Sequence, residues 1–133
     1  MLRAQPPPEP EYRLQLSPCA DPNGRHRTTL VTLRTTKHFS SFRYAIDVDE
    51  RIEGRRITLK ILGLRAPRLD LPAAGPAEFR REFDDLEGEY TFVVEGPDGS
   101  ASELDVRVTP RGVTLRRPVT GTVVAADIPL AHP

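Results

Sequence analysis

Apolar and polar side chains alternate in short runs along most of this chain. The clearest run follows Gly88, where Tyr90, Phe92 and Val94 alternate with polar residues. A period of two predicts a strand with one buried and one solvated face. Residues Pro97–Gly99 come next. They predict a turn, because proline presets φ and glycine accepts a positive φ. Further strands are predicted at residues 12–16, 28–36, 42–48, 57–61, 104–108, 113–115 and 120–124.

The segment 77–86 fits two patterns. Phe79, Phe83 and Leu86 have helical spacing, and they lie between a proline and a glycine that could begin and end a helix. The alternative is an edge strand that leads into the corner at Gly88. We favour the strand because a corner and a further strand follow directly.

Length and composition favour a single all-β domain. The 133 residues are enough for one core, and fourteen prolines and nine glycines punctuate the alternating runs. We predict the domain at residues 11–124, after a flexible proline-rich arm (1–10) and before a tail (125–133). About seven to eight strands indicate an antiparallel β-sandwich, with a small β-barrel as the alternative. The predicted core consists of Tyr44, Ile46, Leu59, Ile61, Tyr90, Phe92, Val94, Leu104 and Val106.

The pattern Leu86-x-Gly88-x-Tyr90-x-Phe92-x-Val94, with the hairpin and strand after it, resembles the closing half of immunoglobulin-like and fibronectin-type sandwiches. The resemblance covers residues 79–108. It implies a structural corner at Leu86, Gly88 and Tyr90, in which the tyrosine hydroxyl bonds back across the corner. It implies no function, because such sandwiches carry many activities. The absence of tryptophan, and a phenylalanine where a cysteine would stand, exclude an antibody-type domain.

The charges balance at nineteen basic and nineteen acidic residues. No global field then attracts the chain to nucleic acid or to a membrane surface, so neither partner is predicted. The sequence contains no apolar run as long as a membrane span and no apolar targeting segment. We therefore expect a cytoplasmic protein.

Side chains capable of catalysis or metal binding form no recognisable motif. The histidines His26, His38 and His132 match no short zinc spacing, and a single cysteine, Cys19, cannot form an internal disulfide. The sequence has no nucleophile elbow, phosphate-binding glycine loop or dinucleotide fingerprint. We predict no catalytic, cofactor-binding or metal-binding residue, no cofactor and no enzyme activity. The alternative is a site assembled in space from His26, His38 and an acid.

Acidic residues crowd the connection between the strands at 42–48 and 57–61. This connection is polar apart from Ile52, which is typical of a solvent-facing hairpin loop. The spacing of the acids departs from that of calcium-binding loops, and three arginines are near enough to neutralise them. We predict a salt-bridged hairpin tip, with calcium binding as a minor alternative. The acids are Asp47, Asp49, Glu50 and Glu53, and the arginines are Arg51, Arg55 and Arg56.

Protein recognition is the function that remains. A sandwich has two open sheet edges, which can accept a partner's strand or a second copy of the chain. The candidate partner surface comprises Leu62, Leu64, Arg65 and Arg68, unless this face packs under residues 65–76. We predict a non-catalytic interaction module that binds a protein partner or forms a homo-oligomer. The alternatives are a small-molecule or anion-binding β-barrel and, third, an enzyme with a spatially assembled histidine and acid site.

Overall fold

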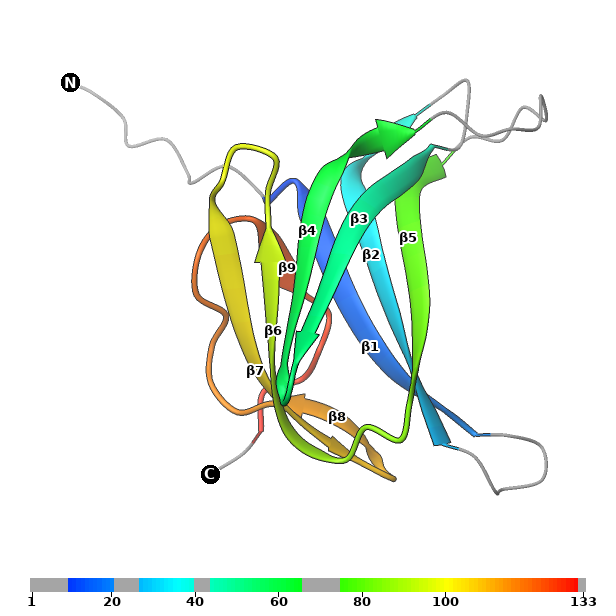
Figure 1. The fold of residues 1–133 in the computed structure, drawn as a ribbon, viewed down its shortest axis with the longest axis vertical. Coiled ribbons are helices and arrows are strands. Elements are labelled where there is room, and N and C mark those ends of the chain that lie inside the picture. Colours follow the sequence, from blue (N-terminus) through cyan, green and yellow to red (C-terminus); the bar gives the residue numbers. More distant parts are fainter. Residues whose placement is uncertain (1–9, 21–26, 40–43, 66–74, 132–133) are drawn as a thin grey trace.

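The computed structural model describes residues 10–20, 27–39, 44–65 and 75–131 (Figure 1). These residues form nine strands and no helix. The strands are β1 (Tyr12–Ala20), β2 (Arg27–Phe39), β3 (Ala45–Glu53), β4 (Arg56–Arg65), β5 (Gly75–Asp84), β6 (Gly88–Glu95), β7 (Ala101–Thr109), β8 (Gly112–Leu115) and β9 (Val124–Ala126). The predicted all-β class is confirmed, and the segment 77–86 lies mostly in a strand, as favoured.

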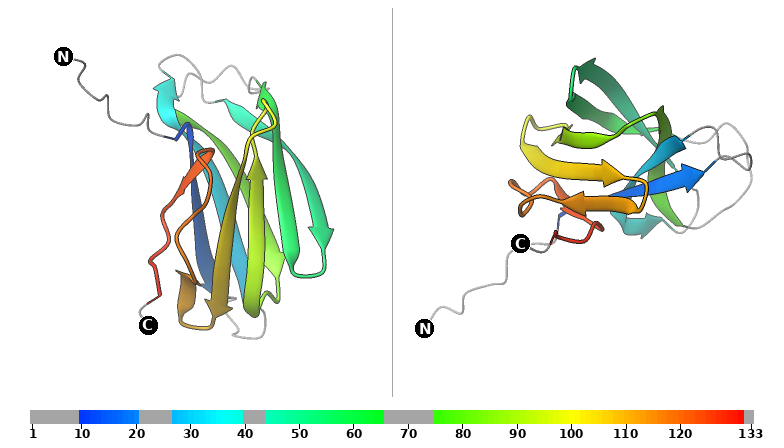
Figure 2. Two further views of the ribbon diagram at one scale, coloured as in Figure 1. Left: turned by 90° about the vertical axis from the view of Figure 1, so that its left-hand side faces the viewer. Right: turned by 90° about the horizontal axis from the view of Figure 1, so that it is seen from below.

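All nine strands join one sheet in the order β8-β7-β6-β4-β3-β5-β2-β1-β9. The sheet curls into a half-barrel, which the two views of Figure 2 show from the side and from one end. Three neighbouring pairs, β1–β9, β3–β5 and β4–β6, run parallel. The sheet is therefore mixed where we expected an antiparallel one.

The hairpin β3–β4 lies between β5 and β6, and this position produces two of the three parallel pairs. β3 pairs with β5 at Ala45 and Glu78, and β4 pairs with β6 over Arg56–Lys60. Only residues 85–87 connect β5 to β6. β5 and β6 therefore form a fork around the hairpin, with residues 85–87 at its apex. The tip of the β3–β4 hairpin lies at this apex.

The strands predicted at 42–48 and 57–61 belong to one hairpin, but residues 57–61 lie opposite residues 48–52, and residues 42–43 lie outside the described ranges. The connection is also shorter than expected. β3 continues to Glu53 and β4 begins at Arg56, so a two-residue turn replaces the predicted loop. Gly54 lies in this turn with a φ of 61°. Tight hairpins need left-handed backbone conformations there, and glycine adopts them without a steric penalty.

The core lies on the concave side of the curled sheet. Tyr44 and Tyr90 are half-buried and pack against the core. Phe83 and Phe92 meet edge to face across the fork, with their ring centroids 6.3 Å apart. The other seven predicted core residues are at most 3% exposed: Ile46, Leu59, Ile61, Phe92, Val94, Leu104 and Val106. Alternation thus identified the buried face of the central strands.

The last described residues join β1 to β8. β9 pairs with β1, and the Asp127 N–H donates to the Leu14 carbonyl at 2.8 Å. Leu115 of β8 exchanges two hydrogen bonds with residues 129 and 131, both of 2.8 Å. Figure 2 shows this red segment beside the blue strand β1. We expected a tail from residue 125, but backbone hydrogen bonds that follow no alternating pattern hold this segment in place.

Candidate functional site

The predicted partner surface lies at the end of β4. Leu62 and Leu64 are two residues apart near the end of the strand, with exposed fractions of 58% and 44%. Arg65 is also exposed, and its Nε lies 3.6 Å from a carboxylate oxygen of Asp47. Arg68 lies outside the described residues. Three of the four predicted residues are thus exposed within the last four residues of β4.

A β-bulge accounts for the exposure of Leu62. Asp47 pairs with Gly63 and Val48 pairs with Ile61, which leaves Leu62 without a partner on β3. Bulges leave one residue unpaired and increase the local twist of the strand. Leu62 therefore lacks the cross-strand neighbour that covers a side chain in a regular ladder.

A cavity of about 440 Å³ adjoins Leu64 where β1 begins and β2 and β4 end. Thr36 fixes its wall, because its N–H donates to the Glu11 carbonyl at 2.8 Å and its hydroxyl donates to the Pro10 carbonyl at 2.6 Å. These bonds hold the residues before β1 against the end of β2. We call this space the Leu64 cavity; its lining is Pro10, Glu11, Tyr12, Thr35, Thr36, Lys37 and Leu64.

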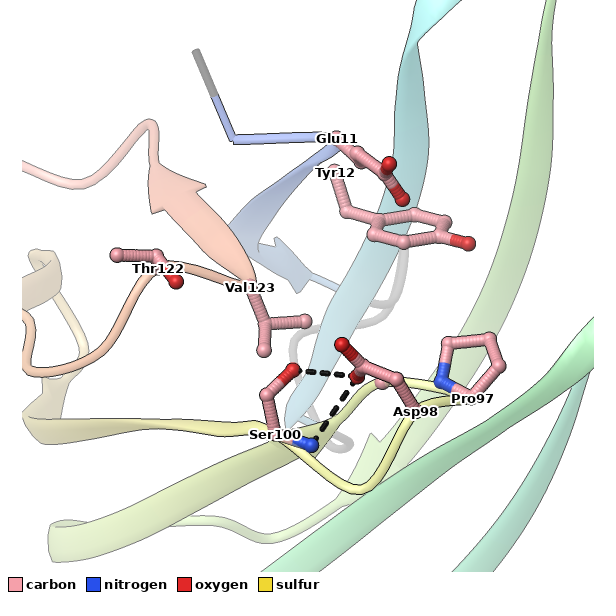
Figure 3. Close-up of a pocket in the computed structure, with 8 residues that line it drawn as sticks. Glu11, Tyr12, Pro97, Asp98, Ser100, Thr122 and Val123 are labelled. Carbon is pink, nitrogen blue, oxygen red and sulfur yellow. Dashed lines mark hydrogen bonds between the residues drawn. The ribbon is translucent and has the colours of Figure 1, made fainter. Parts of the chain in front are cut away.

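A second cavity, of about 430 Å³, lies at the same end of the half-barrel and shares Glu11 and Tyr12 (Figure 3). The turn between β6 and β7 and the residues before β9 form its other walls. Tyr12 is only 8% exposed, and its hydroxyl has no hydrogen-bond partner in the described part of the chain. We call this space the Tyr12 pocket; it is lined by Glu11, Tyr12, Gly96, Pro97, Asp98, Ser100, Thr122 and Val123.

Two carboxylates make the Tyr12 pocket electronegative. One Asp98 oxygen accepts hydrogen bonds from the Ser100 hydroxyl at 2.6 Å and the Ser100 N–H at 3.1 Å. These bonds hold the pKa of Asp98 below its usual value, so the group is charged at neutral pH. Burial, together with the charges of Glu11 and Asp98, raises the pKa of Tyr12, so its phenol keeps its proton. No lysine or arginine is among the described residues that line the pocket.

The acids of the β3–β4 hairpin pair with arginines from several elements. Arg51–Glu53, Arg81–Glu50 and Arg65–Asp47 lie at N–O distances of 3.8, 3.0 and 3.6 Å. Arg55 and Arg56, which we expected to neutralise these acids, instead contact residues of β6, β7 and the corner. In the described ranges no group of three or more histidine, cysteine or acidic side chains could hold a metal ion.

The predicted corner joins β5 to β6, and an arginine from the hairpin tip contacts it. Arg55 Nη1 donates to the Glu87 and Glu89 carbonyls at 3.0 and 3.1 Å, and its guanidinium lies 5.0 Å from the centroid of the Tyr90 ring. Gly88 has a φ of 93°, and a Cβ there would lie 3.2 Å from Arg55 Nη1. Tyr90 itself makes no hydrogen bond through its hydroxyl within the described residues. Arg55 therefore contacts the corner backbone and the Tyr90 ring, while the Glu89 carboxylate pairs with Arg107 and Arg116.

The remaining candidate groups are the three histidines and the single cysteine. His26, His132 and the side chain of His38 fall outside the described residues. Cys19 is a half-buried free thiol that lines a third cavity, of about 350 Å³, at the opposite end of the half-barrel. No described helix is long and apolar enough to cross a membrane.

Comparisons of the chain with protein-family models, curated proteins and solved structures find no match. The functional interpretation therefore rests on the geometry. Sequence reasoning placed Tyr12 in a strand but missed the pocket, because Glu11 and Asp98 are 87 positions apart. Only a turn signal at residues 97–99 marked one of its walls.

Proposed function

We propose that this protein is a non-catalytic interaction module that self-associates through Leu62, Leu64 and the Leu64 cavity. The observation that carries the proposal is the exposure of two large apolar side chains beside a cavity. Contiguous exposed apolar residues are typical of contact surfaces, and a neighbouring cavity can receive an anchoring side chain. Arg65 and Asp47 would form part of the polar rim.

A face is a better candidate than a sheet edge. β8 and β9 have only four and three residues, and residues 124–131 bond to β1 and β8. Short or covered edges resist the addition of another strand. Balanced charge supports a protein partner over nucleic acid or a membrane surface.

The test is the molar mass of the purified chain, measured by light scattering after size-exclusion chromatography at several concentrations. We expect a concentration-dependent dimer for the wild type and a monomer for Leu64→Glu. Ile52→Glu is the matched control, because Ile52 is 51% exposed at the other end of the same hairpin. This control should dimerise like the wild type. A wild type that remains monomeric at every concentration would contradict self-association.

A ligand-binding half-barrel is the second candidate. The two cavities around Tyr12 favour it, although the fully buried side chains of the core place any ligand at the end of the barrel. The immunoglobulin-like topology and the cytoplasmic location stay predictions from the sequence. The enzyme alternative also stays open, since it depends on histidines outside the described residues.

A further inference from the structure

We propose that the Tyr12 pocket binds an organic cation, through an alkylammonium or alkylguanidinium group. This inference goes beyond the proposed function, because the β6–β7 turn and Val123 line the pocket in place of Leu64. It requires no second protein. The same chemistry would suit a free small cation or a lysine or arginine side chain of a partner.

Asp98 supplies the first charge. The turn is fixed by the Gly96 N–H, which donates to the Ser100 carbonyl at 2.8 Å, and by the Gly99 N–H, which donates to the Gly96 carbonyl at 3.1 Å. Only one carboxylate oxygen of Asp98 is used by Ser100. The other oxygen takes part in neither of these bonds and lies on the side of the carboxylate nearer Val123 (Figure 3). A fixed carboxylate with a free oxygen is an acceptor for a charge-assisted hydrogen bond.

Tyr12 provides the observation that distinguishes this pocket from a simple acidic patch. Its side chain is more than nine-tenths buried and lies in the pocket with a hydroxyl that no described group bonds. Since no buried side-chain oxygen of the described residues lacks a partner, this hydroxyl is open to solvent and can meet a ligand. The ring adds an aromatic wall, which attracts organic cations through its negative face.

The remaining groups favour a ligand that donates hydrogen bonds. Glu11 contributes a second carboxylate beside the ring, and the hydroxyls of Ser100 and Thr122 can also accept. Ammonium and guanidinium groups offer three and five donors with a positive charge. An anion would be repelled by the two carboxylates. A hard metal ion would need about six or more oxygen ligands, and no such cluster exists among the described side chains.

The test is a titration of the ¹⁵N-labelled protein with butylguanidinium, followed by NMR chemical shifts. Butylurea, which has a similar shape and no charge, is the matched ligand control. We expect butylguanidinium to shift the amide signals of residues 11–12, 96, 98–100 and 122–123, and butylurea to shift none of them. Equal binding of the two compounds would overturn the proposal.

Three variants assign the binding to named groups. Asp98→Asn keeps the oxygen that accepts from Ser100 but removes the charge, and should weaken binding by about tenfold. Tyr12→Phe keeps the ring and should weaken binding by about threefold. Glu87→Gln removes one negative charge at the opposite end of the half-barrel and should leave the affinity unchanged. Wild-type affinity in Asp98→Asn, or an equal loss in Glu87→Gln, would overturn the proposal.

A parallel titration with N-acetyl-arginine amide identifies the source of the cation. Tighter binding than butylguanidinium would assign the pocket to an arginine side chain of a partner. Tighter binding of butylguanidinium would assign it to a free small cation. If neither compound shifts the pocket residues, the inference is wrong, whatever the oligomeric state of the chain.

Discussion

Arg55 at the tip of the β3–β4 hairpin holds the corner between β5 and β6, and replacing it should measure that role. Its guanidinium makes two hydrogen bonds to backbone carbonyls and lies over the Tyr90 ring. Arg55→Ala removes all three contacts but keeps the backbone bond from the Thr91 N–H to the Arg55 carbonyl. The corner would then keep the ion pairs of Glu89 with Arg107 and Arg116 but lose the Arg55 side chain.

The expected cost follows from the geometry. Solvated hydrogen bonds from a charged donor and an exposed cation–π contact together contribute about 1 to 2 kcal/mol. Arg55→Ala should lower the free energy of unfolding by that amount. Tyr90→Phe should change it by less than about 0.5 kcal/mol, because the ring remains and its hydroxyl has no described partner.

Urea denaturation followed by circular dichroism is the appropriate assay, since the chain contains no tryptophan. Arg51→Ala is the matched control, because Arg51 is an exposed arginine of the same hairpin whose only described ion pair is a 3.8 Å contact with Glu53. Exposed pairs of this kind contribute little, so the control should unfold like the wild type. The double mutant Arg55→Ala/Tyr90→Leu, with both single mutants, isolates the cation–π coupling.

Two results would refute this reasoning. A loss of about 1 kcal/mol in Tyr90→Phe would mean that the tyrosine hydroxyl closes the corner, as the resemblance to immunoglobulin-like sandwiches implies. An unchanged unfolding free energy in Arg55→Ala would mean that the arginine contacts do not stabilise the corner. Either conclusion requires that the unfolding free energies of variant and wild type depend on urea concentration with the same slope, so that their denatured states are comparable.

Three further predictions concern residues 121–127 and the groups that contact them. Ser102 is fully buried and its hydroxyl oxygen accepts two backbone N–H groups at 2.8 and 3.3 Å, so Ser102→Ala should cost about 2 kcal/mol in urea denaturation. Gly121→Ala should lower the melting temperature more than an exposed Gly99→Ala, because a Cβ at Gly121 would lie 2.2 Å from a backbone oxygen, whereas one at Gly99 meets nothing within 4 Å. A hydrogen bond from Arg13 lowers the pKa of Asp127 in the folded state. This pair therefore stabilises the fold above the ordinary aspartate pKa of 3.8, and the effect is lost as the pH falls through the folded value. Arg13→Gln should flatten the acid limb of the stability profile, and a wild type that gains stability on acidification would contradict this sign.

The sequence identified what depends on local patterns. Alternation placed Phe92, Val94, Leu104 and Val106 on one buried face, since a strand exposes every second side chain on the same side. Turn residues then joined β6 to β7 in the expected hairpin. Burial of a whole face also fixes the register, because a slip of one residue would expose every core side chain.

Contacts between distant parts of the chain decided the rest. No local signal places the β3–β4 hairpin between β5 and β6, or Arg55 at the corner between them. The irregular segment after Val123 gave no strand pattern, yet backbone hydrogen bonds hold it against β1 and β8. The Tyr12 pocket exists because the curl of the sheet brings Glu11 and Asp98 to one end of the half-barrel. Periodicity is a property of neighbours along the chain, whereas a site is formed by neighbours in space.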